Sequence, residues 1–178
     1  ALKVHEPGHA MIYRVFPRSS VITRKAIGEH GGTQVIATNI DHAFLVQAMD
    51  RDFNINRLER YLAICHTSGV RPIIVLTKAD LFEAGQVDGL KEQVRSRIAN
   101  VPILALSNVT KDGCEAVRVI MDKGKTYCLL GSSGAGKSSL LNNLLGTATL
   151  RTGAISTSTG KGRHITSHRE LFVLGTGG

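Results

Sequence analysis

The chain has 178 residues, of which 42% are hydrophobic and 20% are charged, and this ordinary globular composition argues against a disordered or fibrous protein. No apolar run approaches the roughly 20 residues that cross a bilayer, and no signal-peptide pattern is present, so we expect no membrane partner. The net charge of +8 favours a polyanionic partner such as nucleic acid, although a soluble basic enzyme would fit it equally well.

The amino-terminal part of the chain differs in character from the rest. Residues 1–34 contain two β-rich stretches, AMIYRVFPR and SVITR, followed by the glycine-rich stretch GEHGG. We interpret residues 1–34 as the end of a small β domain with a linker, and residues 35–178 as a second domain. The cysteines Cys65, Cys114 and Cys128 are too widely spaced to suggest a zinc site, which favours reduced thiols in a cytoplasmic protein.

From about residue 43 onward, short apolar runs alternate with amphipathic segments. The apolar runs predict strands at residues 43–49, 71–77, 101–107 and 126–130. Helical spacing links four sets of residues: Ile55, Leu58, Leu62 and Cys65, with Gly69 as a stop; Leu90, Val94 and Ile98; Ala116, Val117, Ile120 and Met121; and Leu140, Leu141, Leu144 and Leu145. This alternation predicts a doubly wound α/β domain with a mainly parallel sheet, whose ligands bind at the carboxyl ends of the strands. Residues 146–168 are expected to form a long surface loop.

The stretch GSSGAGKS at residues 131–138 satisfies the phosphate-loop pattern and lies between a predicted strand and a predicted helix. Glycines let successive backbone N–H groups turn inward toward phosphate oxygens, and the following helix adds its amino-terminal donors. Lys137 supplies a cation to the β and γ phosphates, and the Ser138 hydroxyl can ligate Mg²⁺. The residues predicted to bind nucleotide here are Gly131, Ser132, Ser133, Gly134, Ala135, Gly136, Lys137, Ser138 and Ser139.

The base is expected to be recognised by the turn Thr77-Lys78-Ala79-Asp80, which directly follows a predicted strand. The Asp80 carboxylate can accept from both N1–H and N2–H₂ of guanine, and adenine offers neither donor there. Two hydrogen bonds to a charged group correspond to roughly 10²- to 10⁴-fold discrimination. Ser107 and Asn108 end the next strand, where the Asn108 backbone N–H can meet the guanine carbonyl.

These motifs occur in an unusual order. Guanine-nucleotide domains ordinarily begin with the phosphate loop and end with the base-reading turns, whereas here the base-reading turns come first. Joining the old termini and cutting elsewhere rebuilds the same sheet, because domain termini often lie close together. The sequence therefore predicts a circularly permuted P-loop GTPase domain.

With this order, the stretches TKADL, GSSGAGKSSLLN and GKGRHITSHREL resemble the bacterial ribosome-small-subunit-dependent GTPase A family, from about Arg14 to the end. The resemblance implies GTP hydrolysis coupled to late maturation of the 30S subunit, with rRNA as partner, GTP or GDP with Mg²⁺ as cofactors, and a monomeric state. It also implies that residues 1–34 are the last strands of an OB barrel.

The same resemblance assigns roles to three further sets of residues. Thr166 would bind Mg²⁺ and the γ-phosphate, and His164 would position the attacking water, although His164 could equally contact RNA as a basic loop residue. Catalysis would thus depend on His164, Lys137 and Thr166, and the metal on Ser138 and Thr166. Arg163, His168 and Arg169 would form a structural or rRNA-facing cluster.

Two departures from the family pattern stand out. Thr77 replaces the commoner Asn and removes an amide that braces the phosphate loop, for which a hydroxyl can partly substitute. The chain stops at LGTGG, before the family's Asp-x-Pro-Gly turn and Cys/His cluster, so we expect a fragment. Zinc is accordingly expected only in a carboxy-terminal domain that this chain does not include.

Two alternatives to a GTPase stay open at this point. A transporter-type ATPase carries a similar phosphate loop but needs an aromatic platform for adenine upstream, which the sequence does not offer. A non-catalytic RNA-binding assembly factor would use its nucleotide only structurally.

Overall fold

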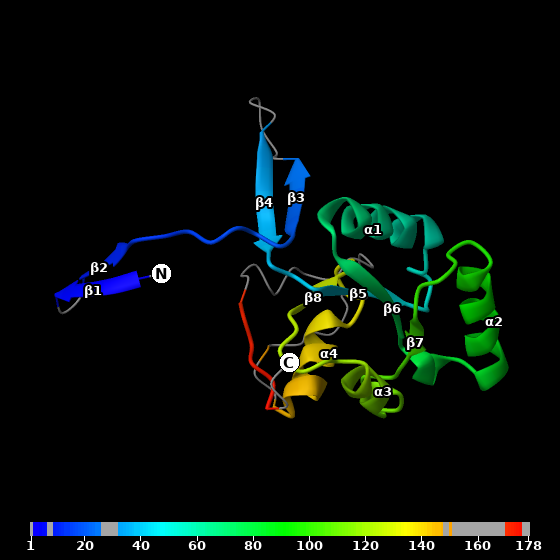
Figure 1. Ribbon diagram of the computed structural model, residues 1–178. Coiled ribbons are helices and arrows are strands. Elements are labelled where there is room, and N and C mark those ends of the chain that lie inside the picture. Colours follow the sequence, from blue (N-terminus) through cyan, green and yellow to red (C-terminus); the bar gives the residue numbers. More distant parts are fainter. Residues whose placement is uncertain (1, 7–8, 26–31, 148–149, 151–169, 176–178) are drawn as a thin grey trace.

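A computed structural model describes residues 2–6, 9–25, 32–147, 150 and 170–175. The central feature is a four-stranded sheet with the order β7-β6-β5-β8, in which every pairing is parallel. Its strands are β5 (His42–Ala48), β6 (Arg71–Thr77), β7 (Ile103–Ala105) and β8 (Tyr127–Leu130). The predicted α/β class with a mainly parallel sheet is therefore confirmed (Figure 1).

Helices cover both faces of this sheet. Helices α1 (Ile55–Ser68) and α2 (Ala84–Arg95) share one hydrophobic cluster with alternate strand residues such as Leu45 and Ile74. Helices α3 (Cys114–Val119) and α4 (Lys137–Leu145) share a second cluster with the intervening residues, including Phe44 and Val75. Because both faces are covered, every residue of β5 is buried, which is why the strands read as continuous apolar runs.

The helix boundaries follow from local capping. The side chain of Asn54 accepts from the backbone N–H of Arg57 at the start of α1, and Gly69 ends the helix in the left-handed conformation, as predicted. Helix α2 ends at Arg95, so Ile98 lies beyond the helix that its spacing suggested. Ile98 is nevertheless buried in the same hydrophobic cluster as α1 and α2, and its backbone N–H donates to the carbonyl of Val94.

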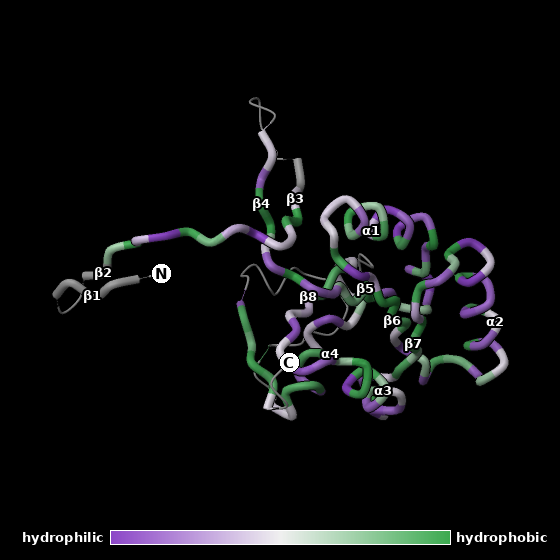
Figure 2. Tube along the Cα trace, in the orientation of Figure 1, coloured by the Kyte–Doolittle hydropathy of each residue, from purple (hydrophilic) through white to green (hydrophobic). Residues whose placement is uncertain are grey.

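The amphipathic character of α1 and α2 is visible in Figure 2, where hydrophilic and hydrophobic segments alternate along both helices. In α4, Leu140 and Leu144 are buried, whereas Leu141 and Leu145 are only partly buried. None of the helices in the described part of the chain is long and apolar enough to span a bilayer.

The amino-terminal residues form two antiparallel pairs, β1 (Leu2–Glu6) with β2 (His9–Ile12) and β3 (Val21–Lys25) with β4 (Thr33–Thr38). Ile22 of β3 joins the hydrophobic cluster that contains α1. Strand β4 runs through positions 34 and 35, and residues 28–31 of the predicted linker GEHGG lie outside the described residues. The domain boundary and the OB-barrel assignment therefore stay predictions.

Candidate nucleotide-binding site

The predicted site residues that the structure describes gather at the carboxyl ends of the sheet strands. All four strands are parallel, so their carboxyl ends lie together, and each continues into a segment with polar side chains. Thr77 ends β6, Ser107 follows β7, and Gly131 follows β8. The structure thus brings together segments that are far apart in the sequence, at the edge where α/β proteins bind ligands.

The phosphate loop depends on glycine at two positions for different reasons. A Cβ atom at Gly131 would lie 2.3 Å from the carbonyl oxygen of Val46, so only glycine fits beside β5. Gly136 has a φ of +89° and precedes the first residue of α4. Between them, Ala135 is fully buried in the cluster under α4, which anchors the loop to the core.

Lys137 begins α4 and folds back over the loop. Its Nζ donates to the carbonyl oxygens of Gly131 at 2.9 Å and of Ser132 at 2.6 Å. Burial lowers the pKa of this ammonium group from its ordinary value. Ser138 and Ser139 follow in the first turn of α4 and are partly buried. A cation and a hydroxyl therefore stand at a helix amino terminus, where phosphate groups bind.

Two side chains from neighbouring strand ends hold the loop from outside. The hydroxyl of Thr77 donates to the carbonyl oxygen of Ala135 at 2.7 Å, across 58 positions of sequence. The amide nitrogen of Asn108 donates to the carbonyl oxygen of Gly136 at 3.2 Å. The segments predicted to read the base are therefore hydrogen-bonded directly to the phosphate loop.

The predicted base-reading turn is itself fixed in shape. Lys78 has a φ of +66°, and its Nζ pairs with the Asp50 carboxylate at 2.6 Å. Ala79 lies in the short helix η1 (Ala79–Leu81), and its N–H donates to the carbonyl oxygen of Leu106. Asp80 is exposed, and its carboxylate has no hydrogen-bond or ion-pair partner among the described residues. This carboxylate is therefore available to a ligand.

Ser107 acts on the shape of the neighbouring turn. Its side chain is buried, and its hydroxyl oxygen accepts from the backbone N–H groups of Val109 and Thr110, both at 3.1 Å. The hydroxyl is therefore engaged within the turn, which fixes the course of the backbone at Asn108.

Two acidic residues at this edge were missed by the sequence analysis. Asp50 pairs with Lys78, and the Asp52 carboxylate accepts from the hydroxyl of Ser132 at 2.8 Å. Arg57 also donates two bonds to Asp52, and these bonds are the main reason that the pKa of Asp52 lies below its ordinary value. Asp50 and Asp52 directly follow β5, at the carboxyl end of a parallel strand, and this position is the signal that could have identified them.

The remaining predicted residues cannot be placed in this arrangement. His164 and Thr166, together with Arg163, His168 and Arg169, lie outside the described residues, as does most of the predicted loop at 146–168. Within the described part of the chain, no group of three or more His, Cys, Asp or Glu side chains could hold a metal ion.

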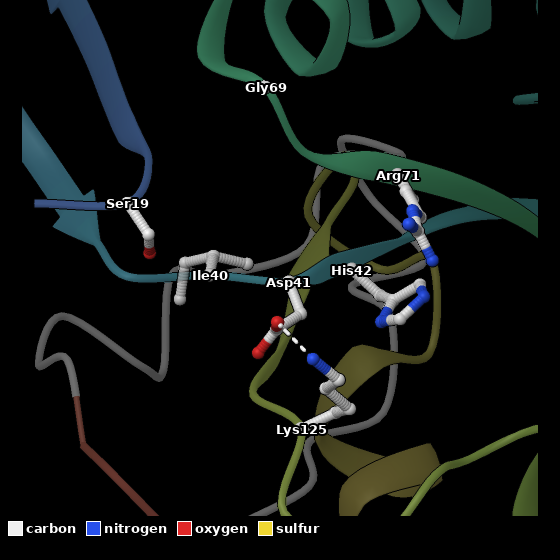
Figure 3. Close-up of a pocket in the computed structure, with 7 residues that line it drawn as sticks. All are labelled: Ser19, Ile40, Asp41, His42, Gly69, Arg71 and Lys125. Carbon is white, nitrogen blue, oxygen red and sulfur yellow. Dashed lines mark hydrogen bonds and ion pairs between the residues drawn. The ribbon is translucent and has the colours of Figure 1, made fainter.

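A small pocket of about 170 Å³ lies at the opposite end of the strands, where β5 and β6 begin (Figure 3). It is lined by His42 and Arg71, which begin β5 and β6, and by Lys125, whose ammonium group pairs with Asp41. None of the predicted nucleotide-binding residues lines it. This pocket is therefore separate from the site at the carboxyl edge.

Comparison with known proteins shows which family the chain resembles. The family model described as RsgA GTPase matches residues 15–178. The chain belongs to the RsgA GTPase family. A relative from Opitutus terrae, named small ribosomal subunit biogenesis GTPase RsgA, is 45% identical over 163 residues, which is 92% of this chain and 44% of that protein. A relative of the same name from Methanosarcina acetivorans is 41% identical over 172 residues, which is 97% of this chain and 46% of that protein.

A solved structure supports the same relationship for the fold. The crystal structure of YjeQ from Thermotoga maritima matches with a TM-score of 0.67 and 25% identity, over 85% of this chain and 51% of that chain. The chain thus spans about half the length of the RsgA relatives that it matches.

Two glycine-to-alanine changes should have opposite effects. In Gly131→Ala the new Cβ would meet the Val46 carbonyl, so we expect a loss of about 1–3 kcal/mol in the free energy of unfolding. Gly89→Ala lies in α2 with nothing within 4 Å of the new atom, and should stabilise by up to about 1 kcal/mol. Urea unfolding of both variants measures this, and equal stabilities would contradict the packing of the phosphate loop on β5.

The Asp52 pair should make stability depend on pH. Because the folded-state pKa of Asp52 lies below the ordinary value of 3.8, its contribution is present above that pH and is lost as the pH falls through the folded-state pKa. Asp52→Asn should therefore destabilise at pH 7 by no more than about 1 kcal/mol, since the pair is partly solvated, and should match the parent protein at low pH. Urea unfolding from pH 7 down through the folded-state pKa of Asp52 tests this, with Asp88→Asn, a largely exposed partner of Lys91, as the control. A difference that persists at low pH would contradict it.

Proposed function

We propose that the protein containing this chain binds and hydrolyses GTP and that it acts in the biogenesis of the small ribosomal subunit. The hydrogen bond from Thr77 to Ala135 carries the proposal, because it joins the base-reading turn to the phosphate loop in one site. Family membership and the names of the RsgA relatives agree with this function.

Recognition of guanine would fall to the exposed carboxylate of Asp80. Guanine presents N1–H and N2–H₂ as neighbouring donors, which a carboxylate can accept together. The pairing of Lys78 with Asp50 restrains the lysine side chain, so that its aliphatic part can lie against the base. Ser107 would act indirectly by fixing the turn, while the Asn108 backbone N–H meets the guanine carbonyl.

Binding of the phosphates would use the loop at residues 131–138. Gly131 and Gly136, where a Cβ would clash, let the backbone curl around a chain of phosphate groups, and Lys137 supplies a partly buried cation beside them. Ser138, in the first turn of α4, would hold Mg²⁺ together with Thr166. The ion supplies neutralisation of the charge that develops on the β and γ phosphates. His164 would orient the attacking water.

The finer assignments rest on charge and on the family. A net charge of +8 suits contact with the rRNA of the subunit, because basic surfaces gain affinity by releasing counterions from phosphate. We place the protein in the cytoplasm as a monomer, with zinc confined to a further domain of the whole protein.

Small ribosomal subunits should accelerate GTP hydrolysis. With purified full-length protein, we expect turnover to rise at least about tenfold on addition of 30S subunits, equivalent to about 1.4 kcal/mol of transition-state stabilisation. The same concentration of 50S subunits is the control, and His164→Ala should abolish most of the rise. Unchanged turnover would refute a coupled GTPase, and subunit binding by Lys137→Ala in every nucleotide state would favour the non-catalytic assembly factor.

Replacing Asp80 should change which base is bound. Asp80→Asn exchanges one acceptor for a donor, so GTP affinity should fall by about 10²-fold. Affinity for xanthosine triphosphate should rise, because xanthine carries a carbonyl where guanine carries its amino group. Asp112→Asn, an exposed acidic residue in the neighbouring turn, is the matched control. Competition binding with GTP, ATP and xanthosine triphosphate measures the outcome, and an unaltered preference would remove Asp80 from the site.

A further inference from the structure

The side chain of Asn108 makes a contact that its predicted role does not explain. Only the backbone N–H of Asn108 was predicted to contact the base, yet the side-chain amide nitrogen of Asn108 donates to the carbonyl oxygen of Gly136 at 3.2 Å. A carbonyl oxygen can only accept, so the amide nitrogen must be the atom that faces Gly136. The side chain therefore has one defined orientation toward the phosphate loop.

Helix α4 fixes this orientation from the other side. The amide nitrogen of Asn143 donates to the backbone oxygen of Asn108 at 3.1 Å and to its side-chain oxygen at 3.3 Å. Arg118 of α3 in turn donates to the carbonyl oxygens of Asn143 and Leu144, near the end of α4. Both ends of the Asn108 amide are therefore held, and its hydrogen bond to Gly136 is pre-organised.

Gly136 is enclosed by Asn108 and Thr77 together. A Cβ atom on Gly136 would lie 2.7 Å from the Asn108 amide nitrogen and 3.5 Å from the Thr77 hydroxyl. Thr77 binds the carbonyl of Ala135, and Asn108 binds the next carbonyl, that of Gly136. These are the last two carbonyls before Lys137.

Holding a carbonyl also aims the N–H group of the same peptide. In a planar trans peptide the C=O and N–H bonds point in opposite directions. The bond from Thr77 therefore turns the N–H of Gly136 away from β6. The Gly136 carbonyl also accepts from the backbone N–H of Leu140 in α4 at 2.9 Å, and the bond from Asn108 adds a second donor that keeps the N–H of Lys137 directed away from the turn after β7. These are the N–H groups that a phosphate loop presents to its ligand.

We propose that Asn108 is a positioning residue of the phosphate loop, which aims the Lys137 N–H at the nucleotide phosphates. Thr77 and Asn108 together thereby hold the phosphate loop in place, as a single asparagine at the position of Thr77 commonly does in guanine-nucleotide domains. This inference rests on the proposed binding of guanine nucleotide at this site. It assigns to the Asn108 side chain a role distinct from contact with the base.

The test compares nucleotide affinities in the full-length protein. Asn108→Ala removes the amide, and Asn108→Asp keeps its shape but places a carboxylate oxygen against the Gly136 carbonyl. We expect both changes to weaken GTP and GDP binding by about 3- to 10-fold, with the larger loss in Asn108→Asp, and to leave the preference for guanine over adenine unchanged. Thr110→Ala, in the same turn and bonded among the described residues only to Ser107 and Asp112, should bind as the parent protein does.

Rescue separates positioning from general packing. Adding Thr77→Asn to Asn108→Ala returns an amide to the position where related domains carry it, and should recover most of the lost affinity. Asn108→Asp with affinity within twofold of the parent would overturn the inference. A loss in Asn108→Ala that follows a lower melting temperature and is not recovered by Thr77→Asn would overturn it too. A parent protein that binds no guanine nucleotide would refute the proposed function itself, whereas failure of the variants alone refutes only this role of Asn108.

Discussion

The site depends on one physical constraint, which is that the phosphate loop is hydrogen-bonded to the turns that follow the neighbouring strands. The buried hydroxyl of Thr77 holds the carbonyl of Ala135, and the amide of Asn108 holds that of Gly136. Without the Thr77 bond the carbonyl of buried Ala135 would lose this partner, and the Asn108 bond adds a donor to a carbonyl that already accepts from Leu140 in α4, so the two bonds favour a single arrangement of three separate segments. Side chains far away in the sequence thereby hold the last two carbonyls of the loop before Lys137.

The order of the motifs along the chain has little physical importance, because the sheet determines where the segments of the site meet. The parallel sheet brings the carboxyl ends of β5, β6, β7 and β8 to one edge, whichever strand comes first. Core contacts on both faces, such as those of Phe44 and Leu45, depend on strand position and not on connectivity. A chain that starts with the base-reading turns can therefore build the same site as one that starts with the phosphate loop.

Sequence reasoning recovered the parts of the structure that depend on local pattern. The apolar run at residues 71–77 matches β6. Gly69 ends α1 in the left-handed conformation, which glycine adopts without steric cost, so this helix end can be predicted from the local sequence. The apolar run at 101–107 is longer than β7, which spans Ile103–Ala105 and, among the described strands, pairs only with β6. The contacts of Asp52 with Ser132 and of Asn108 with Gly136 could not be predicted, because they join turns whose separation is set by tertiary packing.

The most direct measurement of the central claim is a crystal structure of the full-length protein with a non-hydrolysable GTP analogue. We expect guanine N1 and N2 at about 3 Å from the carboxylate of Asp80, a normal hydrogen-bond distance, with the phosphates against the N–H groups of residues 131–138. The bonds of Thr77 and Asn108 to the loop should be retained in that complex. A purine bound away from Asp80, or phosphates held elsewhere than at this loop, would contradict it.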